Sequence, residues 1–244
     1  MSVHRVGTQN LSEKEKNFPL EEVVFEYSTN GTDYTMLTKS TFEKYSHVQA
    51  QSGMTGAQAA AKMLASAGIR DVRIEAVNGF LTDHYDPSCR TLRLSESVYA
   101  NSSLSAIGVA CHEAGHAIQD AAEYKPMYLR SALVPVTNFA STFSYFILIA
   151  GFIFQSSGLV LFGAILFSAA VLFAIVTLPV EWDASSRAKK LMVRSGIVSA
   201  GEQEQAGQVL NAAFMTYLAA AISSLLTLIY YLFRAGVFGG RSDD

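Results

Sequence analysis

The sequence has 244 residues, of which half are hydrophobic and only 16% are charged, and its net charge is −3. This length allows one or two domains, and the lack of a basic excess argues against nucleic acid as a partner. Residues 1–130 have the composition of a soluble protein, whereas residues 131–240 contain long apolar runs. Cys89 and Cys111 are too few for a disulfide scaffold, so we expect reduced thiols.

The first 40 residues are polar and carry no recognisable motif. They lack the apolar core of a cleavable signal peptide, and residues 21–27 have the composition of a short strand. Residues 41–69 are predicted to be helical, with Thr55 as an N-cap and Gly68 at a C-terminal cap.

Two stretches alternate between apolar and polar residues, as strands do: residues 72–77 and 90–95. A turn and a polar loop separate them, so we expect a small antiparallel hairpin or sheet. An exposed edge of this sheet can pair with an extended peptide, and the alternative is that the hairpin is only scaffold.

Residues 104–122 are predicted to form a largely apolar, buried helix that carries His112-Glu113-Ala114-Gly115-His116. Residues four apart share a helix face, so His112 and His116 can direct two imidazole nitrogens at one zinc ion. Glu113 is placed to hold a water molecule at the metal and to take its proton, as in H-E-x-x-H metallopeptidases. The alternative is a helix whose polar residues make ordinary hydrogen bonds.

Three long apolar runs follow: residues 133–154 and 159–180 contain no charged residue, and residues 209–233 form the third. About 20 apolar residues are enough to cross a bilayer, so we expect a transmembrane hairpin and then a third span. The basic residues cluster beside the open end of this hairpin: Lys125, Arg130, Arg187, Lys189, Lys190 and Arg194. The positive-inside rule then places the zinc helix on the cytoplasmic side.

A zinc site needs at least a third protein ligand, and the hairpin returns the chain to the zinc helix at Glu181. Asp183 is the second choice as ligand and otherwise a supporting residue, because positions i and i+2 of a helix point to different faces. The alternative is that both carboxylates pair with the basic residues that follow them. Asp120 can orient His116 by a hydrogen bond to the ring nitrogen that does not face the metal. The candidates for stabilising an oxyanion are His84, Arg187 and Tyr217.

From Thr41 to Phe233 the chain resembles the bacterial YugP-like neutral zinc metallopeptidases, a family of membrane proteins. The matching stretches are FEKYSHVQAQSGMTGAQAAAKML, GFLTDHYDP, LRLSESVY, VACHEAGHAIQDA, RSALVPV, TLPVEWDASSRA and VLNAAFMTYLAAA. More distantly it is similar to membrane gluzincins with a downstream E-x-x-A-D segment, which supports Glu181 as a ligand. The chain departs from that pattern at Ser185, where Asp is expected, and Asp183 is a possible replacement. The resemblance also implies an N-terminal transmembrane helix, for which residues 1–40 contain no apolar run.

The expected fold is therefore mainly α and integral to the membrane. It combines a zincin-like helical catalytic domain, a small antiparallel sheet and about three transmembrane helices. The expected segments are 1–40 (polar N-terminus), 41–130 (catalytic region), 131–180 (transmembrane hairpin), 181–208 (cytoplasmic helix with the third ligand), 209–233 (third span) and 234–244 (tail).

The expected function is that of a plasma-membrane endopeptidase with one zinc ion per chain and Glu113 as general base. Its substrates would be peptides or proteins, membrane proteins among them. The alternative is a non-catalytic membrane scaffold that keeps a structural zinc site.

Overall fold

The structure is a computed structural model that describes residues 31–80 and 82–238, with side chains from residue 36 onward. The strand predicted at residues 21–27 lies outside the described residues. The fold is mainly α, as expected, and its elements are α2 (Gly31–Ser46), α3 (Gly56–Ser66), β1 (Arg73–Val77), β2 (His84–Asp86), β3 (Thr91–Ser95), α4 (Glu96–Tyr99), α5 (Leu104–Ala121), α6 (Lys125–Ile153), α7 (Ser157–Arg194) and α8 (Ala200–Arg234).

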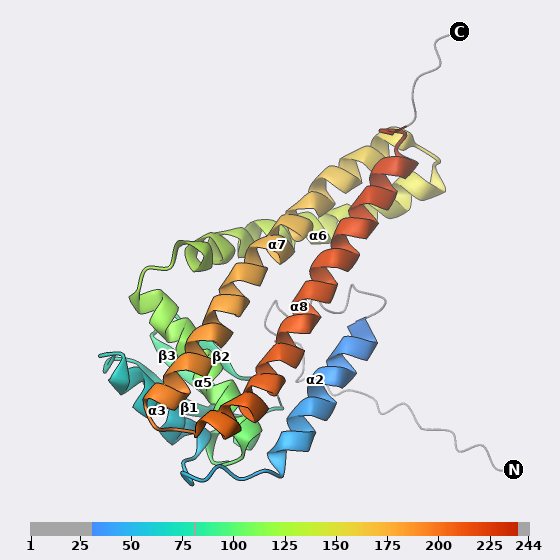
Figure 1. Ribbon diagram of the computed structural model, residues 1–244. Coiled ribbons are helices and arrows are strands. Elements are labelled where there is room, and N and C mark those ends of the chain that lie inside the picture. Colours follow the sequence, from blue (N-terminus) through green and yellow to red (C-terminus); the bar gives the residue numbers. More distant parts are fainter. Residues whose placement is uncertain (1–30, 81, 239–244) are drawn as a thin grey trace, which may run out of the picture.

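Three helices, α6, α7 and α8, are long and apolar enough to cross a membrane. Figure 1 shows α7 and α8 running side by side from the sheet-bearing end to the far end, where a tight turn joins α6 to α7. Helix α2 lies along the lower half of α8 (Figure 1). Helices of suitable length and composition are thus present for the predicted hairpin and third span, and the charged segment after residue 180 continues α7 without a break.

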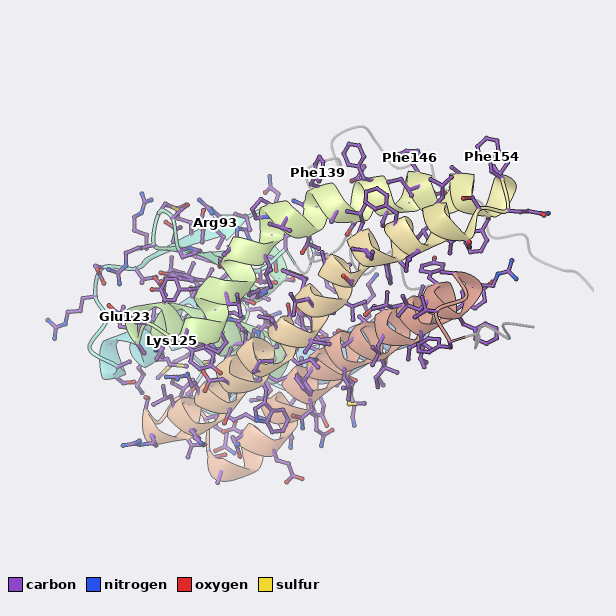
Figure 2. All side chains as sticks on the ribbon, turned by 90° about the horizontal axis from the view of Figure 1, so that it is seen from above. Arg93, Glu123, Lys125, Phe139, Phe146 and Phe154 are labelled. Atoms are coloured by element: carbon purple, nitrogen blue, oxygen red, sulfur yellow. The ribbon has the colours of Figure 1, made fainter. Side chains whose placement is uncertain are left out.

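Helix α6 bends between Lys125 and Phe139 (Figure 2), and Pro135 lies inside this part of the helix. A proline in a helix interior lacks the N–H for one helical hydrogen bond and clashes with the preceding turn, which produces such a kink. Beyond the bend, Phe139, Phe146 and Phe154 point outward from the helix (Figure 2) and are largely exposed. Outward aromatic side chains on an apolar helix are typical of a lipid-facing surface.

Local sequence sets the ends of the helices around the site. Thr55, Ser103 and Ser199 each begin a helix, and each side-chain oxygen accepts a hydrogen bond from a backbone N–H in the first turn. The predicted cap at Thr55 is confirmed. Gly68 follows the end of α3 with φ +79°, a left-handed conformation that glycine adopts without the steric cost that other residues incur.

The sheet is mixed, with strand order β1-β3-β2, so the antiparallel pairing predicted for the two main strands is wrong. Strands β1 and β3 run parallel. The connection between them contains β2, which pairs with β3 in the antiparallel sense, with Tyr85 opposite Leu92. A parallel pair needs a long crossover rather than a tight turn, and residues 78–90 supply it.

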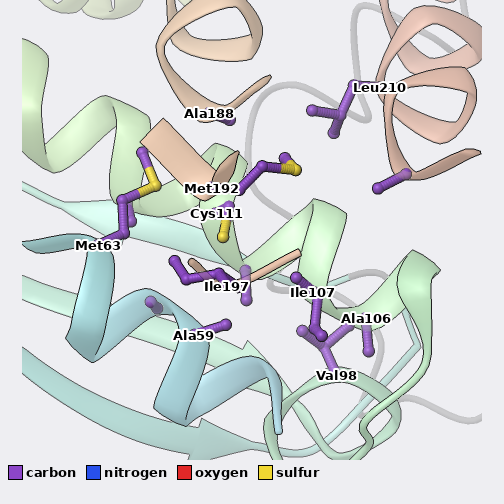
Figure 3. Close-up of a cluster of buried hydrophobic side chains, with 14 of the residues drawn as sticks. Ala59, Met63, Val98, Ala106, Ile107, Cys111, Ala188, Met192, Ile197 and Leu210 are labelled. Carbon is purple, nitrogen blue, oxygen red and sulfur yellow. The ribbon is translucent and has the colours of Figure 1, made fainter. Parts of the chain in front are cut away.

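The hydrophobic core joins the helices of the sheet-bearing end to the end of α7. Met63 of α3, Cys111 of α5, Met192 of α7 and Ile197 of the α7–α8 loop lie together in it and are fully buried (Figure 3). The segment after residue 180 therefore packs into the same core as α3 and α5, and α7 continues without a break from this core into its long apolar part.

Candidate metal centre

Helix α5 brings His112 and His116 to the helix surface that faces α7, and Glu113 lies between them in sequence, next to β2. The close approach of the two helices depends on Gly115, where an added Cβ would lie 2.7 Å from the backbone oxygen of Ala184. Only a residue without a side chain allows this contact. His116 and Glu113 are largely buried, and the two imidazole rings stand nearly perpendicular with centroids 4.8 Å apart.

The side chain of Glu181 enters from α7 and faces both imidazoles. Its Oε2 lies 3.1 Å from Nε2 of His112 and 3.7 Å from Nε2 of His116, and one ligand atom from each residue lies within 4.8 Å of the others. Tetrahedral zinc with bonds of about 2.0–2.1 Å separates its ligand atoms by about 3.3 Å. The two separations from Glu181, 3.1 and 3.7 Å, are close to this value, and the nitrogen and oxygen donors suit a zinc ion.

The outer nitrogen of each imidazole has a partner on the protein. Nδ1 of His116 lies 2.9 Å from Oε1 of Gln119, and Nδ1 of His112 lies 3.1 Å from Oγ of Ser185. The amide nitrogen of Gln119 donates to two acceptors, the backbone oxygen of Val180 and Oδ2 of Asp183. Its oxygen must therefore accept from His116, which puts a proton on Nδ1 and turns the lone pair of Nε2, in the neutral ring, toward Glu181.

Asp183 supports this arrangement at one remove from the histidines. It accepts hydrogen bonds from Gln119 and from Nε of Arg187, whose guanidinium also lies over the ring of Tyr124. Asp183 thus reaches His116 through Gln119, while Ser185 contacts His112 at the position where the distant gluzincins have Asp. The hydrogen bond between Gln119 and Asp183 links α5 to α7, and Arg187 links Asp183 to Tyr124 at the start of α6.

Arg130 also lies at the centre, although its sequence position indicated only a basic border. Its Nη2 lies 3.7 Å from Oε1 of Glu181, so this cation faces one carboxylate oxygen while the imidazoles face the other. Neither Arg130 nor Gln119 was predicted from the sequence to contact the candidate metal ligands. Gln119 is three residues after His116 on the same helix face, which was an available signal.

Glu113 lies beside this cluster with its side chain largely buried. Burial raises its pKa to about 8, although the backbone N–H of Tyr85 hydrogen-bonds to the carboxyl group and opposes this shift. A buried carboxylate keeps its charge at neutral pH only when a cation is near. The position of Glu113 therefore suits a group that takes up and releases a proton.

The histidine pKa values show that Glu181 requires positive charge nearby. Burial lowers the pKa of His112. Burial has the same effect on His116, but the charge of Glu181 and the hydrogen bond to it outweigh burial and raise the pKa of His116 to about 9. A metal ion can replace that proton between the two side chains, since ligand imidazoles bind metals in the neutral form.

The remaining predicted site residues, Asp120, His84 and Tyr217, are not among the three candidate metal ligands but lie near them. Asp120 accepts hydrogen bonds from Tyr85 and Tyr128, whereas Gln119 takes the contact with His116 that was predicted for Asp120. His84 directs Nδ1 at the Thr82 backbone oxygen and Nε2 at Arg93. Tyr217 of α8 lies within electrostatic range of Glu181, Arg130 and Glu113.

Comparison with known proteins points to a family of zinc metallopeptidases. Residues 32–236 match the family described as "Putative neutral zinc metallopeptidase". The chain is also similar to the "Putative membrane protease YugP" of Bacillus subtilis (strain 168), with 49% identity over 194 residues that cover 80% of this chain and 86% of that protein. No solved structure matches this chain.

Proposed function

The chain belongs to the family described as "Putative neutral zinc metallopeptidase", and on this premise we propose that it is a membrane-anchored zinc endopeptidase. One zinc ion per chain would be held by His112, His116 and Glu181. The observation that carries the proposal is the convergence of their three ligand atoms within 4.8 Å, although Glu181 lies 65 residues after His116 in the sequence.

Zinc, when bound, supplies a Lewis acid and lowers the pKa of a coordinated water. Glu113 adjoins the first ligand and acts as the general base that takes the proton of the attacking water and then delivers it to the leaving amine. Gln119 and Ser185 hold the imidazoles in orientation from their outer nitrogens. Asp183 and Arg187 fix Gln119 and the facing turn of α7.

The substrate would lie along β2, which is an edge strand of the sheet next to α5. An extended peptide can add to such an edge through its own backbone hydrogen bonds. The Tyr85 backbone at this edge faces Glu113, which would bring a peptide paired there to the general base. Tyr217, because it lies within electrostatic range of the cluster, is the best placed of the three candidates for stabilising the oxyanion.

The test is the substitution Glu113→Gln in the full chain, purified in detergent. Zinc content should stay at about one per chain, while peptidase activity should fall by roughly 10²–10⁴-fold, the usual contribution of a general base to the rate. Glu123→Gln is the matched control, since Glu123 is exposed beyond the end of α5. A Glu113→Gln variant that keeps full activity would contradict the mechanism, and a parent protein with zinc but no activity would favour the scaffold with a structural metal.

A further inference from the structure

The candidate metal centre begins where the apolar part of α7 ends. Val180 is the last residue of the uncharged run, Glu181 follows it, and Trp182 comes next. A helix rises 1.5 Å per residue, so these three residues lie at nearly the same depth along α7. Glu181 is 2% exposed and faces α5, whereas Trp182 is 57% exposed and packs edge-on against Phe214 of α8.

Two aromatic–basic pairs lie close to that depth. Nζ of Lys189 is 5.7 Å from the centre of the Trp182 ring, and the guanidinium of Arg187 is 5.8 Å from the centre of the Tyr124 ring. Tryptophan and tyrosine concentrate at the boundary between lipid and water, where nearby basic side chains meet phosphate groups. This belt of Tyr124, Trp182, Arg187 and Lys189 is therefore typical of side chains at the level of the lipid headgroups.

Exposed apolar side chains on other helices continue beyond the uncharged runs. Tyr128 and Leu129 precede the first run, yet both are about half exposed on α6. Met36 and Leu37 are exposed on α2 next to Thr38, whose hydroxyl donates to the backbone oxygen of Ala212 in α8. Large exposed apolar side chains are typical of a surface that contacts a membrane, and here they occur on α2 and α6 outside the uncharged runs.

We infer that the metal centre lies at the depth of the lipid headgroups, and that its substrates are the short segments in which membrane-anchored proteins leave the bilayer. The substrate part of this inference rests on the proposed peptidase function. The depth of the site does not depend on that function. A scissile bond held at Glu113 would lie beside the belt, within reach of a chain that is still anchored in the lipid.

Trp182 is the only tryptophan of the chain and therefore reports this depth directly. The full chain is reconstituted in phosphatidylcholine vesicles whose acyl chains carry bromine near the headgroup or near the bilayer centre. Shallow bromines should quench Trp182 more strongly than deep ones. Equal or greater quenching by deep bromines, or no quenching at all, would overturn the inference.

Two variants in a Trp182→Phe background calibrate the measurement. Leu172→Trp moves the probe about 15 Å toward the bilayer centre, and Arg194→Trp moves it about 18 Å the other way, by the rise of the helix. Both positions are exposed on α7. Deep bromines should quench the tryptophan of Leu172→Trp most strongly. Neither shallow nor deep bromines should quench the tryptophan of Arg194→Trp.

Cleavage in the same vesicles separates this inference from the proposed function. The substrates are synthetic peptides with an apolar membrane anchor and a flanking segment whose length is varied, compared with the same flanking segment without an anchor. Cuts confined to the residues nearest the anchor support the inference. Equal cleavage of the unanchored peptide overturns the substrate class and leaves the peptidase intact, whereas failure to cleave any peptide, with shallow quenching of Trp182, rejects the peptidase and keeps the depth.

Discussion

Glu181 is a buried carboxylate between two kinds of positive group. Arg130 faces its Oε1, and the two imidazoles, or a metal ion bound with them, face its Oε2. A buried charge is costly unless it is compensated, so Arg130 stabilises the metal-free protein. The same positive charge repels a metal ion and holds one carboxylate oxygen away from it. We therefore predict that Arg130 lowers zinc affinity and keeps the site formed without zinc.

We expect Arg130→Gln to bind zinc at least about tenfold more tightly than the parent, because a nearby cation is removed at a site of low effective dielectric constant. The metal-free variant should melt at a lower temperature, so the rise in melting temperature on adding zinc should be larger than for the parent. Competition with a chelator measures the affinity, and thermal unfolding in detergent measures the rise.

The controls for this prediction separate charge from shape. Arg130→Lys retains a cation and should lie between the parent and Arg130→Gln. Lys125→Gln removes the same charge from an exposed position on α6 and should leave zinc affinity unchanged. Weaker zinc binding by Arg130→Gln would show that Arg130 chiefly orients Glu181 as a ligand, contrary to this prediction.

Residue spacing was enough to nominate the three candidate ligands, but it did not find the residues that support them. The spacing of His112 and His116 alone places them on one helix face. Glu181 was nominated because a pair of membrane-spanning helices returns the chain to the side of the membrane that carries these histidines. Ser185, Gln119 and Arg130 act through contacts between different helices. Such contacts depend on how the helices rotate against each other, which no local pattern in the sequence states.

At the scale of elements, the site depends on how closely α5 and α7 approach. The two helices touch where Gly115 meets the backbone of Ala184, one turn from both His112 and Glu181. A second glycine on α5, Gly108, lies against α8, where an added Cβ would be 3.2 Å from the backbone oxygen of Ala206. Small residues thus allow one helix to pack closely against two others.

Gly115→Ala should weaken zinc binding by about 10²-fold, because the new methyl group would separate α5 from α7 and shift Glu181 from the histidines by a distance on the order of 1 Å. Stability should fall by about 1–3 kcal/mol, the usual cost of overpacking, despite the higher helix propensity of alanine. Zinc affinity by chelator competition and the melting temperature test both expectations.

Gly201→Ala is the matched control for this prediction. It lies in the first turn of α8, where an added Cβ would meet nothing within 4 Å. This variant should bind zinc as the parent does and be equally or slightly more stable. If Gly115→Ala retained the zinc affinity of Gly201→Ala, the spacing of α5 and α7 would not control the site.

The elements differed in how well their sequence predicted them. The start of α3 at Thr55 was predicted from its capping residue, and the long apolar helices were predicted from their runs of uncharged residues. The sheet was mispredicted because strand direction depends on the path of the connection, and β2 within that connection was too short to recognise. Local periodicity identifies strands but does not determine which strands pair.

At the scale of the whole molecule, charge is distributed unevenly between the two ends of the membrane helices. The start of α6 and the end of α7 carry a cluster of basic residues: Lys125, Arg130, Arg187, Lys189, Lys190 and Arg194. The turn between α6 and α7 is uncharged. The candidate metal centre lies at the basic end. By the positive-inside rule we propose that this end faces the cytoplasm.

Cysteine labelling tests this orientation in intact bacterial cells that express the full chain. Cys89 is first replaced by Ser, and Cys111 can remain because it is fully buried. A membrane-impermeant maleimide should then label Gln155→Cys, in the exposed turn between α6 and α7, without disruption of the cells. It should label Lys190→Cys, which is exposed at the basic end, only after the membranes are broken.

The two sites make the experiment decisive because Gln155 lies just before the start of α7 and Lys190 lies near its end. The reverse pattern would place the basic end outside, against the charge rule, and a peptidase at that end would then act on the external segments of membrane proteins. Labelling of both sites in intact cells would instead show that α7 does not span the bilayer. Neither result would alter the geometry of the zinc ligands, since α5 and the end of α7 are packed together in one core whichever side they face.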